Sequence, residues 1–251
     1  MQRSSSPKVQ IIEYGDSKLS KPVIIVGIPE AGLVGSIATS YLASVLKLPE
    51  IGYVESELEV PVIVVEKSVP KYPFRIYGKD SLVLFACDIP LTPKLATEFS
   101  FTLVEWAIAK NSRLMIGVSG LPSSDRLEQE QELPDVFYAA TAQKEVYSSV
   151  IGAAQPLEEG VIVGTYSLIL KRCMAMRQPN ITFFAESHLD FPDPGAAAAV
   201  INILRMLLGL DIDIKPLLQE SEQIRLKSRD LMKRTQQSMK QMSQGTPELY
   251  A

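Results

Sequence analysis

Short runs of consecutive apolar residues alternate along this chain with longer segments whose apolar residues recur at helical spacing. Residues 23–26 read Val-Ile-Ile-Val and are closed by Gly27, a pattern typical of a strand that is buried on both faces. Residues 31–47 follow with helical spacing and end before Pro49. Strands buried on both faces belong to parallel sheets that carry helices on each side. The alternation therefore predicts a three-layer α/β/α sandwich around a largely parallel sheet.

The same patterns continue through the rest of the chain. Thr92 before Pro93 and Asp193 before Pro194 are typical of helix starts, and Gly209 is typical of a helix end. Further strands are predicted at 60–65, 74–77, 81–86, 114–118, 161–164 and 181–185. Further helices are predicted at 93–110, 165–177 and 195–208. The strand residues expected in the core are Val23, Ile25, Leu82, Leu84, Ile116 and Val163.

The segment 215–243 differs from the rest in composition. It carries seven basic and three acidic side chains, so its net charge is +4 in a chain of net charge −4. Leu217, Ile224 and Leu231 recur every seven residues, but the companion seam is polar and disfavours a strong coiled coil. We expect a solvated helix, with a weak helix bundle between subunits as the alternative. The expected organisation is a disordered N-terminus (1–8), an α/β/α domain (9–214), a long helix (215–243) and a flexible tail (244–251).

Composition and charge exclude several classes of protein. With 25 basic and 29 acidic side chains, the chain lacks the positive charge that attracts nucleic acid or an anionic membrane. Cys87 and Cys173 are too few for a disulfide framework and have no zinc-site spacing. The apolar stretches are interrupted before they reach the ~18–20 residues of a membrane helix, and the N-terminus lacks the apolar run of a signal peptide. We therefore expect a cytoplasmic protein with no nucleic-acid or membrane partner.

The turn between the first buried strand and the first helix is rich in glycine. Residues 27–35 read Gly-Ile-Pro-Glu-Ala-Gly-Leu-Val-Gly, which resembles a phosphate-binding loop at a helix N-terminus. The dinucleotide-binding motif Gly-x-Gly-x-x-Gly is absent, and the P-loop motif Gly-x-x-x-x-Gly-Lys-Ser/Thr lacks its lysine. Glu30 also places a negative charge where a phosphate would lie. We therefore interpret the segment as a tight turn in which Gly32 and Gly35 allow close helix–sheet packing. No cofactor is predicted.

The single histidine, His188, is the second candidate. It could form a catalytic pair with Ser119, which lies at a predicted strand end, where ligands bind in open sheets. One histidine excludes a multi-histidine metal site, and the sequence has no Gly-x-Ser-x-Gly nucleophile elbow. Turn and capping roles are favoured over catalysis for residues 186–193. A small-molecule pocket near Glu30, Ser119 and His188 stays open as a possibility.

The C-terminal residues are the third candidate. Gly245 and Pro247 end the long helix, and the chain closes with Leu249, Tyr250 and Ala251. Such a tail presents an apolar side chain, a phenol and the terminal carboxylate together, so it can enter a pocket of a partner and pair with a lysine. The alternative is a frayed end without function.

Three stretches of the chain resemble one known family. They are the turn from Val26 to Ala38, the pair 74–77 and 82–84, and the segment from Ala185 to Asp213 that contains Pro192-Asp193-Pro194-Gly195. In these residues the chain resembles the archaeal homologues of proteasome assembly chaperones. The family often has Gly and Tyr in the loop before Pro-Asp-Pro, whereas this chain has the residues 188–191, His-Leu-Asp-Phe.

The resemblance implies an α/β/α sandwich of the nucleoside-phosphorylase-like kind and no catalytic activity. It also implies a homo-oligomer, a tetramer or a pentamer, that binds α-subunits of the 20S proteasome. In some archaeal members a hydrophobic–Tyr–any-residue motif docks between α-subunits, and the matching residues here are Leu249, Tyr250 and Ala251. The resemblance does not separate an assembly chaperone from an activator of the finished proteasome. The alternative hypothesis is a nucleotide- or nucleoside-binding enzyme that uses a strand-end pocket of the same sheet.

Overall fold

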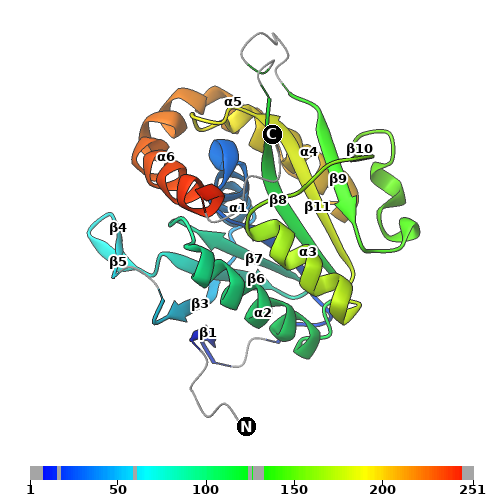
Figure 1. Ribbon diagram of the computed structural model, residues 1–251, viewed down its shortest axis with the longest axis horizontal. Coiled ribbons are helices and arrows are strands. Elements are labelled where there is room, and N and C mark those ends of the chain that lie inside the picture. The colour runs from blue at the N-terminus through cyan, green and yellow to red at the C-terminus, as the bar shows by residue number, and fades with distance from the viewer. Residues whose placement is uncertain (1–7, 16–17, 59–60, 124–125, 127–132, 245–251) are drawn as a thin grey trace.

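The fold is built around one nine-stranded mixed sheet (Figure 1). The computed structural model describes residues 8–15, 18–58, 61–123, 126 and 133–244, with side chains up to residue 237. The strands are β1 Val9–Glu13, β2 Val23–Gly27, β3 Glu50–Ser56, β4 Val64–Glu66, β5 Val69–Lys71, β6 Phe74–Lys79, β7 Leu82–Cys87, β8 Leu114–Pro122, β9 Val136–Ala140, β10 Gln155–Pro156 and β11 Asn180–Ser187. The helices are α1 Val34–Val45, α2 Pro93–Ala109, α3 Thr165–Met176, α4 Pro194–Leu208, α5 Lys215–Gln219 and α6 Ser221–Gln244, with short 3-10 helices at Ala31–Leu33 and Lys144–Val150.

The centre of the sheet is parallel and its edges are mixed. The strand order is β1-β3-β6-β7-β2-β8-β11-β9-β10. Strands β7, β2, β8 and β11 are parallel neighbours, while β1, β3 and β6 extend the sheet antiparallel on one side and β9 pairs antiparallel with β11 on the other. In this register Ile25 of β2 lies beside Leu84 of β7 and Ile116 of β8. The carboxyl ends of the four parallel strands therefore meet at one edge of the molecule.

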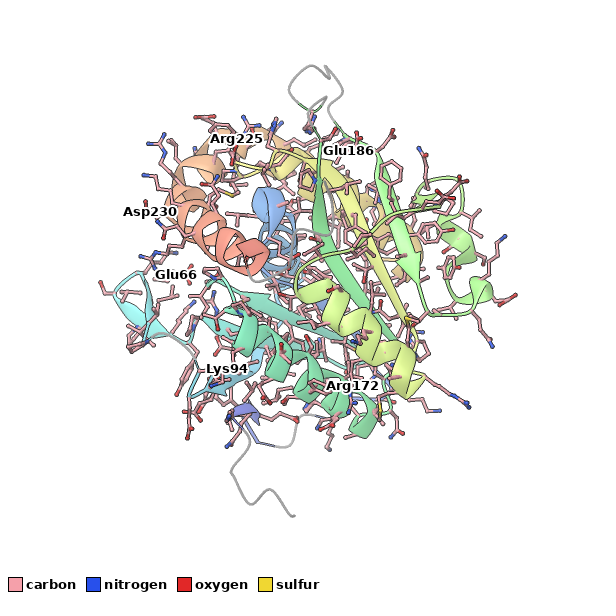
Figure 2. The ribbon with its side chains drawn as sticks, viewed as in Figure 1. Glu66, Lys94, Arg172, Glu186, Arg225 and Asp230 are labelled. Carbon is pink, nitrogen blue, oxygen red and sulfur yellow. The ribbon has the colours of Figure 1, made fainter. Side chains whose placement is uncertain are left out.

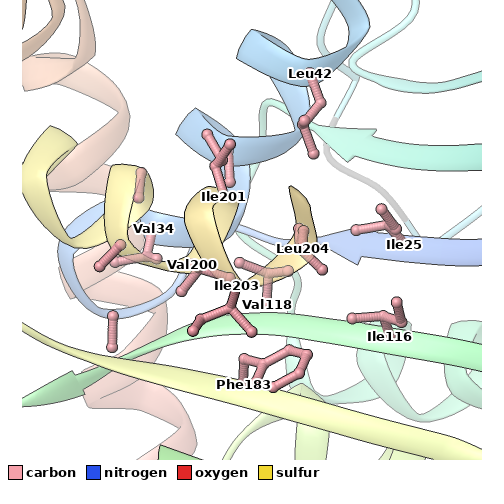
Figure 3. Packing of buried hydrophobic residues seen from close by; sticks show 14 of the residues in the cluster. Ile25, Val34, Leu42, Ile116, Val118, Phe183, Val200, Ile201, Ile203 and Leu204 are labelled. Atoms are coloured by element: carbon pink, nitrogen blue, oxygen red, sulfur yellow. The ribbon is translucent and has the colours of Figure 1, made fainter. Parts of the chain in front are cut away.

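Helices cover both faces of this sheet. Alternate strand side chains point to opposite faces, so each apolar strand supplies two cores. Ile25 and Ile116 pack against α1 and α4 (Figure 3), and Leu84 belongs to the same cluster. Ile24 and Phe85 pack against α2 and α3 on the opposite face. The predicted three-layer α/β/α sandwich is confirmed.

The predicted helix ends of the central helices are also confirmed. Thr92 Oγ1 accepts a hydrogen bond of 3.3 Å from the backbone nitrogen of Leu95 at the start of α2. Asp193 caps α4 in the same way, with 3.0 Å between its Oδ1 and the nitrogen of Ala196. Gly209 ends α4 with a φ of 65°, in the left-handed region that glycine adopts without a steric cost.

The predicted strand at 161–164 is wrong. This segment is irregular, and Val163 is 62% exposed instead of lying in the core. The positions on either side of β11 are occupied by β8 and β9, so residues 161–164 do not pair with β11, the strand that follows them in the sequence. They cross the carboxyl-end edge of the sheet instead. Among the other predicted core residues, Leu82 is half-buried, while Val23, Ile25, Leu84 and Ile116 are buried.

The strand predicted at 60–65 is shorter than expected and lies outside the main sheet. Val60 lies outside the described residues, and among the described residues 61–66 the strand is β4, from Val64 to Glu66, which forms a two-stranded hairpin with β5. The hairpin projects from the left side of the view in Figure 1. Strands β1, β3 and β9 were not predicted, because their apolar residues are interrupted by polar ones.

The C-terminal segment packs against its own chain. It is divided at Glu220 into α5 and α6, and the heptad residues Leu217, Ile224 and Leu231 contact the core cluster on the α1–α4 side. Met232 and Thr235 are buried there as well. The expectation of a solvated helix is therefore wrong for this face, because its apolar seam is covered within the protomer. The opposite face is polar, as the outward position of Asp230 in Figure 2 illustrates.

Candidate functional site

A cavity of about 390 Å³ lies at the carboxyl ends of the central strands. This is the edge at which open α/β sheets bind ligands. The irregular segment 157–163 forms one wall, and the turn after β2 together with the end of β8 forms the other. Its lining residues are Glu30, Ala31, Ser119, Gly120, Leu121, Pro122, Leu157, Glu159, Gly160, Val161, Ile162, Val163 and Phe184.

The glycine-rich turn holds Glu30 at this cavity. Strand β2 approaches α1 so closely that a Cβ on Gly27 would lie 2.2 Å from the carbonyl oxygen of Gly35. A Cβ on Gly35 would lie 2.4 Å from the carbonyl oxygen of Val118. Gly32 and Leu33 both adopt left-handed backbone conformations, with φ of 61° and 53°, which reverse the chain between strand and helix. The interpretation as a tight turn with close helix–sheet packing is confirmed.

The Glu30 carboxylate holds the N-terminus of α3. Its Oε1 accepts a hydrogen bond of 2.8 Å from the backbone nitrogen of Thr165, and its Oε2 accepts one of 3.2 Å from Ser119 Oγ. The residue before the helix is Gly164, which has no side chain to cap it. A Cβ there would lie 2.7 Å from Glu30 Oε1. Glu30 therefore supplies, from the turn after β2, the negative charge that a helix N-terminus favours.

Burial changes the acidity of Glu30. Desolvation raises the pKa of this carboxyl from 4.5 to about 7, although the hydrogen bonds from Thr165 and Ser119 act in the opposite direction. In the described part of the chain, the lining of the cavity includes Glu159 as a second carboxyl and no Lys or Arg. The site therefore carries acceptors and negative charge without a compensating basic side chain.

Glu30→Gln is expected to flatten the dependence of stability on pH. Because the folded pKa of about 7 exceeds the usual 4.5, this group favours the folded state most below pH 4.5, and that contribution is lost as the pH rises through 7. At about 1.36 kcal/mol per pKa unit, the wild-type loss between about pH 5 and pH 8 is roughly 2–3 kcal/mol. Urea denaturation at the two pH values measures it. The exposed control Glu145→Gln should leave the wild-type slope unchanged, and an equally steep slope in Glu30→Gln would refute the assignment.

Tyr166 joins the strands beneath this cavity. Its hydroxyl accepts a hydrogen bond of 3.0 Å from the nitrogen of Ile28 and lies between the carbonyl oxygens of Val26 and Val118, to which it donates. Burial, followed by the charge of Glu30, raises its pKa well above the usual value, so the phenol stays neutral. Sequence reasoning missed Tyr166 and Thr165, because a tyrosine on an amphipathic helix looks like any core residue. The absence of a capping side chain at Gly164 was the one available signal.

His188 does not belong to this cavity, which corrects the expected grouping of Glu30, Ser119 and His188. Its Nε2 lies 3.8 Å from Oδ2 of Asp193. Asp193 in turn forms two hydrogen bonds with Arg126, from Nε at 3.0 Å and from Nη2 at 3.2 Å. Burial, with smaller effects of nearby Arg126 and Arg225, lowers the pKa of His188, while Asp193 opposes the shift. Thus Ser119 bonds to Glu30, and residues 188–193 serve turn and capping roles.

A second hollow, of about 540 Å³, separates α6 from the loop at 190–192. Arg225, Arg229 and Lys233 line it from α6, together with Phe191. Three basic residues of the C-terminal segment therefore line this hollow, together with Glu222 and Asp190. The candidate tail residues Leu249, Tyr250 and Ala251 lie outside the described residues.

The described residues contain no cluster of three or more His, Cys, Asp or Glu side chains that could hold a metal ion. Among their helices, none is long and apolar enough to cross a membrane.

Comparisons with known proteins place this fold in a defined class. It is the fold of archaeal homologues of proteasome-assembly chaperones: the crystal structure of PbaA from Pyrococcus furiosus matches with a TM-score of 0.82 and 27% identity, over 92% of this chain and 99% of that one. The chain belongs to the PAC2 family, whose model matches residues 24–232.

Two further relatives extend the comparison. An uncharacterised protein of Methanocaldococcus jannaschii is 26% identical over 241 residues, which cover 96% of each chain. The fold is also that of Pyrococcus furiosus PbaB, described as an archaeal proteasome activator, with a TM-score of 0.73 and 23% identity over 88% of this chain and 99% of that one.

Proposed function

We propose that this protein is a non-enzymatic, homo-oligomeric binding protein that docks on the α-ring of the 20S proteasome through its C-terminal tails and acts as an assembly chaperone or an activator. The observation that carries the proposal is the similarity to PbaA, a homologue of proteasome-assembly chaperones, over nearly the whole chain at 27% identity. The terminal residues Leu249, Tyr250 and Ala251 supply the docking chemistry.

The tail combines three modest interactions. A fully buried leucine side chain contributes about 1.5–3 kcal/mol, and a hydrogen bond from a lysine to the terminal carboxylate contributes about 1.5–3 kcal/mol. Tyr250 adds a buried ring and one hydrogen bond. After the cost of ordering the tail, one copy binds weakly, and several copies on one oligomer gain about 10²–10⁴ in avidity.

Removal of this chemistry is expected to abolish binding to the proteasome. Purified 20S particles on a biosensor surface should bind the wild-type protein and should not bind Tyr250→Ala or a variant with one residue added after Ala251. The melting temperature should stay at the wild-type value, because α6, which packs on the core, ends at Gln244 before the tail. Tyr14→Ala, which removes an exposed tyrosine from the opposite end of the chain, is the control. If Tyr250→Ala bound the 20S particle as tightly as the wild type, the tail proposal would be wrong, and the contact would have to be made by the α/β body.

The oligomer itself gives a separate prediction. Light scattering at micromolar concentration should give four or five times the chain mass of 27.7 kDa, because multivalent docking requires several tails on one particle. The Tyr250→Ala oligomer should have the same mass. A particle of 27.7 kDa would contradict this prediction.

The alternative of a nucleotide-binding enzyme receives little support from the strand-end cavity. Its described lining holds Glu30 and Glu159 and no basic side chain that could pair with a phosphate. A rise in melting temperature with saturating ATP would favour that alternative.

A further inference from the structure

The strand-end cavity is arranged to accept hydrogen bonds. Glu30 accepts hydrogen bonds from the backbone nitrogen of Thr165 and from the hydroxyl of Ser119. A carboxylate offers about four acceptor positions, so these two donors leave about two for a group in the cavity. Glu159 adds a second carboxyl to the lining. A bound group that donates hydrogen bonds and carries positive charge would use the free acceptor capacity of Glu30 and would balance the negative charge of the lining.

The other wall of the cavity is apolar and open to solvent. Val161 and Val163 are 63% and 62% exposed, and Ile162 between them also lines the cavity. Leu157, Leu121 and Phe184 continue this surface. These three consecutive branched residues therefore leave apolar surface in contact with water, and covering that surface would be favourable. A ligand with an apolar body would bury part of that surface.

We propose that this cavity binds a small organic cation, whose ammonium group pairs with Glu30 and whose apolar body lies against the 161–163 wall. The volume of about 390 Å³ is within the range of small-molecule sites. Anionic ligands are disfavoured, because the described lining residues are acidic or neutral. The site is on the α/β body and does not depend on the C-terminal tail.

The proposal also sets the direction of the pH dependence. An ammonium ion pairs with the ionised form of Glu30, so affinity should rise between pH 5.5 and pH 8. The other titratable groups that face Glu30 are Glu159 across the cavity and the buried phenol of Tyr166 below it. Of these, Tyr166 stays neutral over this range because its pKa is raised well above its usual value.

The test uses three probes that share one apolar body: 2-phenylethylammonium, 2-phenylethanol and 3-phenylpropionate. Titrations of the full-length protein, labelled at the methyl groups of Ile, Leu and Val, report on Leu157, Val161, Ile162 and Val163 directly. We expect the ammonium probe to shift these methyl signals saturably and to bind at least tenfold more tightly than the alcohol. The carboxylate probe should not bind.

Two variants test the contacts, with one matched control. Glu30→Gln should weaken the ammonium probe at least tenfold and remove the pH dependence of its binding. Val161→Lys should also weaken binding of the ammonium probe at least tenfold, because it places a second cation at the cavity. Val161 is exposed, so this substitution should not disturb folding. Val65→Lys changes a valine that is also 63% exposed, on the β4–β5 hairpin, and should bind like the wild type.

Three results would overturn the proposal: no saturable shift with the ammonium probe, equal affinity for the ammonium and the alcohol, or wild-type binding by Val161→Lys. Because Tyr250→Ala should bind this probe normally, failure of the cavity and failure of the proteasome-docking proposal are separate outcomes.

Discussion

Asp193→Ala is expected to lower the free energy of unfolding by about 3–5 kcal/mol, the range for removing one partner of a buried ion pair. Asp193 is fully buried, and its carboxylate neutralises the buried guanidinium of Arg126 through two hydrogen bonds. The same carboxylate accepts hydrogen bonds from the backbone nitrogens of His188 and Ala196. Alanine therefore removes at one position a charged partner of the buried Arg126, the cap of α4 and an anchor of the preceding loop.

Urea denaturation compares this variant with two others. Asp193→Asn keeps an oxygen for the α4 cap and loses the charge, so it separates the cap, worth about 1 kcal/mol, from the ion pair. Asp190→Ala removes an exposed carboxyl from the same loop, whose partner Gln236 lies at the surface, and should stay within about 0.5 kcal/mol of wild type. A loss below about 1 kcal/mol in Asp193→Ala would show that Arg126 does not depend on this carboxylate.

Leu84→Ala is expected to lower the free energy of unfolding by about 2–5 kcal/mol, as buried leucines generally do. Leu84 is fully buried in the middle of β7, beside Ile25 of β2, in the core cluster that α1 and α4 cover. Neighbours on the adjacent strands and the helix layer hold the backbone in place, so the space left by the side chain cannot close completely.

The matched control is Leu226→Ala. Leu226 lies on α6 and is 57% exposed, so its truncation should change the free energy of unfolding by no more than about 0.5 kcal/mol. If Leu84→Ala cost less than about 1 kcal/mol in the same denaturant titration, the placement of β7 in the core would be wrong.

The layers of the fold could be predicted because each central element carries its own signal. The apolar run before Gly27 predicts a strand buried on both faces, and the structure places it as β2 between β7 and β8. Thr92 and Asp193 predict the starts of α2 and α4 through a local hydrogen bond to the helix backbone, and both bonds form.

The candidate site could be predicted only in part. Glu30 and Ser119 stand at the ends of predicted strands, and parallel strands bring such ends to one edge, where these two residues form a hydrogen bond. Thr165 joins them from a position 135 residues after Glu30 in the sequence. The one local sign that its backbone nitrogen needs a distant partner is that Gly164, the residue before the helix, has no side chain to cap it. The same applies to Arg126, whose partner Asp193 is 67 residues distant.

The sequence by itself therefore determined the central strands and helices, whose continuous apolar runs and helix caps carry their own signal, and that these elements are apolar enough to form the layers. Only the tertiary structure decided what each apolar or charged residue meets. Residues 161–164 have the composition of a strand, yet β8 and β9 already flank β11, so they line a cavity instead. Leu217, Ile224 and Leu231 form a seam that would suit another subunit, yet it packs on the core of its own chain. Burial of apolar surface is favourable but not directional, so periodicity reports that a face will be covered, while the geometry of the whole chain selects what covers it.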